Sequence, residues 1–308
     1  MTALAGAGLT IGAMRAGVID VGSNTVRLLV AASGRRGLST VLSERTHVAL
    51  ATDIERSGGL ISASKLSELA HVAGEYTGRA RDAGADPLEV IVTAPGRQSG
   101  NAWVLHRVLA EATGLSVRQL SAAEEGHLAY AGAVAGCRSV REPIGVIDVG
   151  GGSTQLMVGT AAEPAWLQAL DVGSLRLTER YVDKDPASKR ELAAIAEAVE
   201  QAFEGVTPPL PRSVLAAGGT ARALRRIAGK RVGQRQLRGA LETLTAAPAR
   251  RVVKKHEISP ERARVLPAGI IILREAHRRL GVTFEVARGG VREGAILGLL
   301  DELDEAAA

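Results

Sequence analysis

The hexapeptide GVIDVG occurs twice in this chain of 308 residues, at Gly17–Gly22 and again at Gly145–Gly150. Each copy is followed within a few residues by Ser and Thr and then by a second apolar run. A single copy would indicate only a buried strand that runs into a turn. Two identical copies that begin the same order of predicted elements indicate a duplicated unit. We therefore predict an α/β protein with two similar lobes, residues 15–135 and 136–308, around a central cleft.

The expected elements alternate in a similar order in both lobes. In the first lobe, strands are expected at residues 18–21, 26–31, 38–42, 90–93 and 115–120, and helices at 62–83, 100–112 and 122–135. In the second lobe, strands are expected at 144–149, 154–158, 165–170 and 213–215, and helices at 174–182 and 187–203, before a mainly helical remainder to residue 302. Because 46% of the residues are apolar but only 2% are aromatic, both cores are expected to be aliphatic.

Several classes of protein are disfavoured by composition. The segment before Arg15 is apolar but carries no basic residue, so we expect no signal peptide, and no later segment offers the run of about 18 apolar residues that a membrane helix needs. The single cysteine, Cys137, excludes an internal disulfide framework and fits a reducing cytoplasm, where we expect the protein to act. The six histidines show no paired metal-ligand spacing, so a zinc site is not expected.

The net charge of +5 is unevenly distributed along the chain. Residues 222–292 contain 18 Lys or Arg against five acids, an excess of 13 positive charges. Such an excess is typical either of a solvated basic surface or of a site for a polyanion such as nucleic acid, polyphosphate or a nucleotide. The sequence leaves both interpretations open.

Each copy of the repeat contains an aspartate, Asp20 or Asp148, near the end of its apolar strand and just before a glycine-rich turn. Glycine lets backbone N–H groups approach a phosphate closely, and a run of such groups forms an anion-binding nest. A third turn of this kind, AAGGTAR at residues 216–222, follows a strand and opens a helix, whose N-terminus attracts anions as well. Two facing turns would hold a phosphate chain from both sides and leave the aspartates free for Mg²⁺, which prefers carboxylate and phosphate oxygens.

Eight segments that appear in order along the chain carry a family resemblance: VIDVGSNTVRLLV, TAPGRQSGN, LSAAEEGHLAY, VIDVGGGSTQLMV, LDVGSLRLTERY, AAGGTARAL, VLPAGIIIL and GGVREGAIL. Together they resemble the exopolyphosphatase and guanosine pentaphosphate phosphatase (Ppx/GppA) family, within the actin, sugar-kinase and chaperone-ATPase superfamily, from residue 16 to residue 300. The resemblance is to the short form of the family. It implies two ribonuclease-H-like lobes.

The same resemblance implies an activity. Members release orthophosphate from the end of inorganic polyphosphate or from pppGpp, with Mg²⁺ as cofactor. No membrane and no specific nucleic acid is expected as a partner. A requirement for a monovalent cation such as K⁺, the choice between polyphosphate and pppGpp, and a homodimeric state stay open.

Site roles follow from the same resemblance. Glu125 matches the glutamate that activates the attacking water, although the first turn of a helix also favours a carboxylate there for structural reasons. Its neighbour Glu124 is accounted for by a capping box with Ser121. Asp20, Asp148 and Gln155 match metal-site positions. The positions that match substrate contacts are Gly22, Ser23, Asn24, Thr25, Arg27, Arg97, Gly150, Gly151, Gly152, Ser153, Thr154, Gly218, Gly219, Thr220 and Arg292.

One position departs from the family pattern. After the second phosphate loop the family usually has glutamate, as in GGGSTE, whereas this chain has Gln155. The amide keeps an acceptor oxygen but loses the charge that would help to hold Mg²⁺. The main hypothesis is therefore a Mg²⁺-dependent exophosphatase, and the alternative is a weakly active or non-catalytic sensor that binds polyphosphate or an alarmone in the same cleft.

Overall fold

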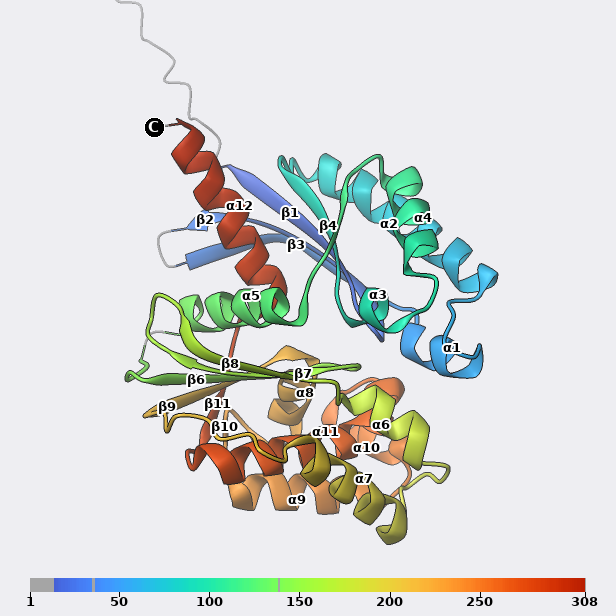
Figure 1. Cartoon of the computed structure of the whole chain (residues 1–308), viewed down its shortest axis with the longest axis vertical. Coiled ribbons are helices and arrows are strands. Elements are labelled where there is room, and N and C mark those ends of the chain that lie inside the picture. Colours follow the sequence, from blue (N-terminus) through green and yellow to red (C-terminus); the bar gives the residue numbers. More distant parts are fainter. Residues whose placement is uncertain (1–13, 35–36, 138, 308) are drawn as a thin grey trace, which may run out of the picture.

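A computed structural model describes residues 14–34, 37–137 and 139–307, which form two α/β lobes, each built on one sheet (Figure 1). The first sheet has the order β3(Gly37–His47)-β2(Thr25–Gly34)-β1(Arg15–Val21)-β4(Leu88–Val92)-β5(Val117–Gln119). The second has the order β10(Arg231–Val232)-β11(Phe284–Val286)-β9(Ser213–Ala217)-β6(Ile144–Val149)-β7(Thr154–Gly159)-β8(Pro164–Leu170). The predicted two-lobed α/β architecture is confirmed.

The repeated hexapeptides form equivalent strands. In each lobe the repeat strand, β1 or β6, pairs antiparallel with the next strand and parallel with the strand after the crossover, β4 or β9. Asp20 lies opposite Arg27 in the first hairpin, and Asp148 lies opposite Gln155 in the second. Because directly paired residues project from the same face of a sheet, each aspartate has its partner beside it. Arg27 and Gln155 therefore occupy the same position in the two repeats.

Helices cover both faces of each sheet, and α1 and α6 meet at the edge of the cleft. Their bounds are α1(Leu50–Arg56), α2(Ala63–Asp82), α3(Ala94–Gln98), α4(Ala102–Thr113), α5(Ala122–Ala135), α6(Ser174–Tyr181), α7(Lys189–Ala202), α8(Gly218–Ala228), α9(Gln234–Thr245), α10(Ala249–His256), α11(Pro260–Leu280) and α12(Val291–Ala307). The cores are aliphatic, as expected: α2 and α4 pack on one face of the first sheet, and α6 to α11 provide the main core of the second. None of the described helices is long and apolar enough to cross a membrane.

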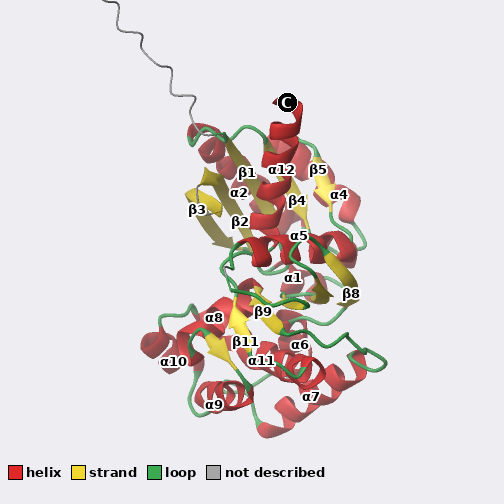
Figure 2. Cartoon of the chain, turned by 90° about the vertical axis from the view of Figure 1, so that its left-hand side faces the viewer, coloured by secondary structure: helices red, strands yellow, loops and turns green. Residues whose placement is uncertain are grey.

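The chain crosses between the lobes twice, and this departs from the predicted division at residue 136. Helix α5 packs on the second sheet, where Tyr130 and Ala133 join the same apolar cluster as Met157. Helix α12 returns to the first lobe, where Ile296 and Leu300 pack with the apolar side chains of β1 and β2. Figures 1 and 2 show α12 on the upper sheet and α5 between the two sheets. Part of each predicted lobe therefore completes the core of the other.

The two crossing helices approach each other very closely. A Cβ at Gly132 of α5 would collide with the carbonyl oxygen of Gly290, and one at Gly294 of α12 would collide with the carbonyl oxygen of Leu128. Glycine at these positions lets the helix backbones touch. This contact lies beside the loop that leads into α12, which carries part of the wall of the cleft described next.

Candidate active site

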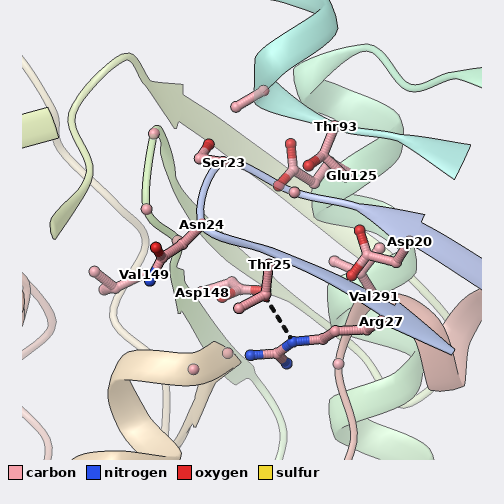
Figure 3. A pocket seen from close by; sticks show the side chains of 18 of the residues that line it. Asp20, Ser23, Asn24, Thr25, Arg27, Thr93, Glu125, Asp148, Val149 and Val291 are labelled. Atoms are coloured by element: carbon pink, nitrogen blue, oxygen red, sulfur yellow. Dashed lines mark hydrogen bonds between the residues drawn. The ribbon is translucent and has the colours of Figure 1, made fainter. Parts of the chain in front are cut away.

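A cavity lies where the two sheets face each other, and it is lined by the turns that follow the repeated strands (Figure 3). The β1–β2 turn, the β6–β7 turn, the start of α8 and the loop before α12 all contribute to it. Of the predicted substrate and metal positions, the residues that line the cavity are Asp20, Gly22, Ser23, Asn24, Thr25, Arg27, Glu125, Asp148, Gly150, Gly151, Gly152, Ser153, Gly218, Gly219 and Arg292. Four positions, Arg97, Thr154, Gln155 and Thr220, lie behind this lining.

The two repeated turns are closed in the same way. The N–H of Gly22 donates to the carbonyl oxygen of Thr25 at 3.1 Å, and the N–H of Gly150 donates to the carbonyl oxygen of Ser153 at 2.9 Å. The turns also touch each other, because a Cβ at Gly152 would come within 2.6 Å of Ser23 Oγ. A phosphate group between the lobes would therefore meet backbone and side-chain donors from both turns.

The third turn closes the cavity beside an aspartate. Gly218 has a φ of +79°, and a Cβ there would collide with Asp148 Oδ1. Glycine is therefore required both by the backbone conformation and by the close approach of the carboxylate. The turn also opens α8, whose first two residues, Gly218 and Gly219, line the cavity, so the N-terminus of this helix can attract an anion there. Thr220, one residue further on, is fully buried, and its hydroxyl has no hydrogen-bond partner among the described residues.

Four carboxylates line the cavity: Asp20 from β1, Asp148 from β6, Glu125 from α5 and Glu293 from α12. The first three are labelled in Figure 3. Burial raises the pKa of Glu125 to about 7, against the opposing effect of Arg97. Burial also raises the pKa of Asp148 to about 6 and raises the pKa of Asp20 above its usual value of 3.8. The charges of Asp20 and Asp148 raise the pKa of Glu125, and the charge of Glu293 raises the pKa of both aspartates, so the cavity holds negative charge only at a cost in free energy.

Glu125 is held by a network behind the cavity. The Arg97 guanidinium donates to Glu125 Oε2 at 2.6 Å and to the carbonyl oxygen of Leu120 at 2.8 Å. Arg97 Nη2, the nitrogen that donates to Glu125, also lies 3.4 Å from Ser153 Oγ. Ser153 Oγ accepts a second hydrogen bond from Gln155 Nε2 at 3.1 Å. Arg97, a predicted phosphate contact, therefore lies behind the cavity lining and orients the carboxylate of Glu125. Glu125 itself is 8% exposed and faces the cavity.

Gln155 and Thr154 play supporting parts in the second turn. Gln155 is 1% exposed, and its Oε1 has no hydrogen-bond partner among the described residues. Its position opposite Asp148 keeps it beside the cavity, while its amide supports Ser153. The Thr154 hydroxyl donates to the carbonyl oxygen of Val172 at 2.6 Å and so anchors the turn to the following loop.

The cavity also contains residues that the sequence did not reveal. Arg222 and Arg262 line it together with Arg27 and Arg292. Burial, together with the positive charge of Arg222, lowers the pKa of Arg27 to about 9 and that of Arg262 to about 10. The other unpredicted members of the lining are Thr93, Ala94, Val149, Gly290, Val291 and Glu293. Arg222 belongs to the quoted AAGGTAR turn, and Gly290, Val291 and Glu293 belong to GGVREGAIL, so these motifs contained a signal.

The donor set can be tested against Mg²⁺. Among residues 14–34, 37–137 and 139–307, no group of three or more His, Cys, Asp or Glu side chains is arranged to hold a metal ion. Mg²⁺ needs only one or two carboxylates when phosphate oxygens and water complete its shell. Asp20 and Asp148 provide two hard oxygen donors, and Asn24 Oδ1 is buried without a hydrogen-bond partner among the described residues. The site therefore fits Mg²⁺ together with a phosphate ligand.

Two opposed glycine-rich turns, buried carboxylates and clustered arginines lie between two similar α/β lobes, an arrangement suited to a phosphorylated ligand. A family profile described as "Ppx/GppA phosphatase family" matches residues 29–303, and the chain belongs to this family. The chain is 30% identical to Exopolyphosphatase 1 of Mycobacterium leprae, with 94% of this chain and 90% of that protein covered. It is 29% identical to Exopolyphosphatase 1 of Mycobacterium tuberculosis, with 94% and 89% covered.

Solved structures give the same result. The crystal structure of the Aquifex aeolicus Ppx/GppA family member superposes with a TM-score of 0.79 at 25% identity, and covers 94% of this chain and 98% of that one. An exopolyphosphatase from Cytophaga hutchinsonii superposes with a TM-score of 0.84 at 19% identity, and covers 94% and 98%. The second likeness concerns the fold alone. The predicted family and the actin-like fold are both confirmed.

Proposed function

We propose that this protein is an exopolyphosphatase, which hydrolyses the terminal phosphoanhydride bond of inorganic polyphosphate and releases orthophosphate. One observation carries the proposal: the carboxylate of Glu125, with a pKa of about 7, faces a cavity formed by two opposed phosphate-binding turns. A general base works best when its pKa lies near the working pH. The curated relatives from Mycobacterium carry the name exopolyphosphatase, which agrees with this assignment.

The residues of the cavity have different roles in the proposed reaction. The two turns and Arg292 hold the terminal phosphate, and Glu125 accepts a proton from the attacking water. A new O–P bond then forms in line with the bridging P–O bond, which breaks, so that orthophosphate leaves on one side and the shortened chain on the other. Arg97 acts as a positioning residue, because it fixes the carboxylate of Glu125 and favours its ionised form.

Mg²⁺ is part of the proposal. Asp20 and Asp148 would hold the ion, and Asn24 would add an amide oxygen. A bound Mg²⁺ supplies positive charge that neutralises phosphate oxygens as negative charge moves to the leaving group. Gln155, beside Asp148, would act on this site through Ser153 or as a neutral oxygen donor.

Phosphate release from a small panel tests the function. The panel contains short and long polyphosphate, pppGpp and ATP, each with and without Mg²⁺ and with K⁺ or Na⁺ as the monovalent ion. We expect Mg²⁺-dependent release from polyphosphate, and we expect Glu125→Gln to lower kcat by about 10²–10⁴-fold while polyphosphate still binds. Glu124→Gln is the matched control, because that side chain caps α5 and does not line the cavity. Equal activity of Glu125→Gln and wild type would remove Glu125 from the mechanism.

A second candidate, a polyphosphate or alarmone sensor, is favoured by Gln155 alone. The amide leaves the cavity with one carboxylate fewer than the usual family motif provides. Turnover separates the candidates, because a sensor binds the anion and releases no phosphate. Phosphate release from pppGpp in the same panel decides whether the protein also hydrolyses this nucleotide.

A further inference from the structure

Gln98, the last residue of α3, reaches from the first lobe across the cleft to the second phosphate-binding turn, residues 150–153. Its Nε2 donates to the carbonyl oxygen of Gly152 at 3.0 Å and to Asp171 Oδ1 at 2.7 Å. We propose that Gln98 is a positioning residue, which holds the second turn in its phosphate-binding shape and joins that turn to the helix that orients Glu125. This inference rests on the proposed function, because it assigns a further residue to the same reaction.

The carbonyl oxygens of the second turn are engaged by donors from both lobes. Those of Gly150 and Gly151 accept hydrogen bonds of 3.0–3.1 Å from backbone N–H groups at the start of α6, in the same lobe. The carbonyl oxygen of Gly152 accepts from Gln98, in the other lobe. A carbonyl oxygen that faced the cavity would repel a phosphate, whereas N–H groups that face it form an anion-binding nest. The bond from Gln98 therefore keeps the turn suited to an anion.

The same bond fixes the direction of the next N–H group. Because the peptide unit between Gly152 and Ser153 is planar and trans, its carbonyl and its N–H point in opposite directions. No backbone carbonyl among the described residues accepts from the Ser153 N–H, and Ser153 lines the cavity. Gln98 is not part of that lining. It therefore orients a donor that is available to phosphate without touching the phosphate itself.

Position 98 needs a side chain that donates. Both partners of Gln98 Nε2 are acceptors, a peptide oxygen and a carboxylate oxygen. Asp171 is itself held by Arg176 Nη1 at 2.5 Å, which keeps its carboxylate in place. Glutamate has the size of glutamine but no N–H, so at this position it would set a second carboxylate against both acceptors. The substitution Gln98→Glu therefore conserves shape and removes donation.

One short helix carries the contacts to the turn and to the general base. Arg97, the neighbour of Gln98 in α3, donates to Glu125 Oε2 at 2.6 Å and lies 3.4 Å from Ser153 Oγ. Figure 1 shows α3 on the side of the first lobe that faces the second. A shift of α3 away from the turn would therefore loosen the turn and also move the guanidinium that orients the base.

The lobes have a second contact that does not depend on Gln98. Ala51 of α1, Leu175 of α6 and Val265 of α11 form a buried apolar cluster that joins the lobes. Gln98 is only half-buried, so its replacement creates no cavity in either core. Substitutions at position 98 should therefore leave the fold and the closed arrangement in place and report on the turn.

Steady-state kinetics with polyphosphate test the proposal. We expect Gln98→Glu to lower kcat/KM about 10–100-fold, with KM raised and kcat lowered about three- to tenfold each, because an unsatisfied polar group shifts an equilibrium by about 5–150-fold. Gln98→Ala should lower kcat/KM about three- to tenfold, since water can then reach the carbonyl of Gly152. Asp171→Ala, which keeps the bond to Gly152, should change kcat/KM less than threefold. Gln234→Glu makes the same change at an exposed position of α9 and should alter neither constant more than twofold.

A double-mutant cycle tests the link through α3. If Gln98 acts on Glu125 through Arg97, the loss of kcat caused by Gln98→Glu should shrink to less than twofold in the Arg97→Gln background, whereas the increase in KM should persist. Additive losses of kcat would overturn the link to the base. Unchanged KM and kcat in both Gln98→Glu and Gln98→Ala, or a loss in Asp171→Ala as large as that in Gln98→Ala, would overturn the positioning role.

Binding is measured separately from turnover. In the Glu125→Gln background, labelled polyphosphate should bind about three- to tenfold more weakly when Gln98→Glu is added, and the addition of Gln234→Glu should change binding less than twofold. Equal binding by the Gln98→Glu and Gln234→Glu proteins would also overturn the positioning role. Failure of the wild type to release phosphate from any substrate would instead refute the proposed function, and the binding comparison would still decide whether Gln98 holds the turn.

Discussion

Replacing Glu125 by glutamine should remove activity and stabilise the fold at alkaline pH. The pKa of this carboxyl is about 7 in the folded chain and 4.5 in an ordinary environment. A raised pKa means that the folded state binds the proton more tightly, so stability falls as pH rises through this window. The difference of about 2.5 pKa units corresponds to about 3 kcal/mol at pH 8, and to less than about 1 kcal/mol at pH 5.

The net gain should be smaller than this value, because glutamine offers Arg97 a neutral acceptor in place of a carboxylate. We expect Glu125→Gln to raise the free energy of unfolding by about 1–3 kcal/mol at pH 8, which corresponds to a Tm increase of roughly 2–6 °C for a chain of this size. At pH 5 we expect no increase. Thermal unfolding should be followed by circular dichroism in buffer free of Mg²⁺ and phosphate, since ligands favour the ionised carboxylate.

Glu124→Gln is a control for which the change in Tm at pH 8 should have the opposite sign. Hydrogen bonds from Ser121 and the charge of Arg118 lower the pKa of Glu124, so its carboxylate stabilises the fold above pH 4.5 and loses that effect as pH falls. This variant should lower Tm slightly at pH 8. If Glu125→Gln changed Tm equally at pH 5 and pH 8, or lowered it at pH 8, the argument that burial raises the pKa of Glu125 would be refuted.

Three further substitutions test the surroundings of the site. Arg97→Gln removes the cation that favours the ionised form of Glu125. The acid limb of the kcat/KM profile, measured from pH 6 to 10, should therefore move to higher pH by roughly 1–3 pH units. An unchanged profile would contradict the positioning role of Arg97. Gln155→Glu should lower the Mg²⁺ concentration for half-maximal activity, whereas unchanged metal dependence would mean that residue 155 acts only through Ser153. Gly132→Val should lower the free energy of unfolding in urea by about 1–3 kcal/mol, because its side chain would collide with the loop before α12. Gly298→Ala should leave the free energy of unfolding unchanged, since the space around its Cβ is open. Equal effects of the two substitutions would argue against the close helix contact.

Much of the fold could be predicted because the repeats and their periodicity are local signals. The strands around both hexapeptides lie where the alternation of apolar and turn residues places them. The partner of a helix is not a local signal, and for this reason the exchange of α5 and α12 between the lobes could not be inferred. An apolar helix face shows that a helix is buried but not on which sheet it packs. The short elements α1, α3, β10 and β11, of seven residues or fewer, carry too little periodicity to be recognised.

The turns of the site could be predicted for the same reason, whereas two of its arginines, Arg222 and Arg262, could not. Arg222 and Arg262 are separated by a strand and two helices and meet only because α8 and the start of α11 converge on the cavity. The positive excess in residues 222–292 pointed toward an anion but did not say which charges matter. Arg278 and Arg279, in the same segment, pair with Glu275 and lie away from the cleft lining. Within that segment, Arg222, Arg262 and Arg292 therefore line the cavity, whereas Arg278 and Arg279 belong to the outer surface.

The cavity contains opposite charges that do not neutralise one another. Burial raises the pKa of Glu125 and Asp148, and burial lowers the pKa of Arg27 and Arg262, so each set would gain from a partner of opposite sign. The two sets lie close together, because Asp20 is beside Arg27 across the first hairpin, but the charges of Arg222 and Arg27 only partly offset the effect of burial, and the pKa of Asp148 stays raised at about 6. A ligand that satisfies both must present a cation to the carboxylates and a row of anions to the guanidiniums. A phosphate chain with Mg²⁺ at its end has this distribution of charge, so the proposed metal and the proposed substrate fit the same set of buried charges.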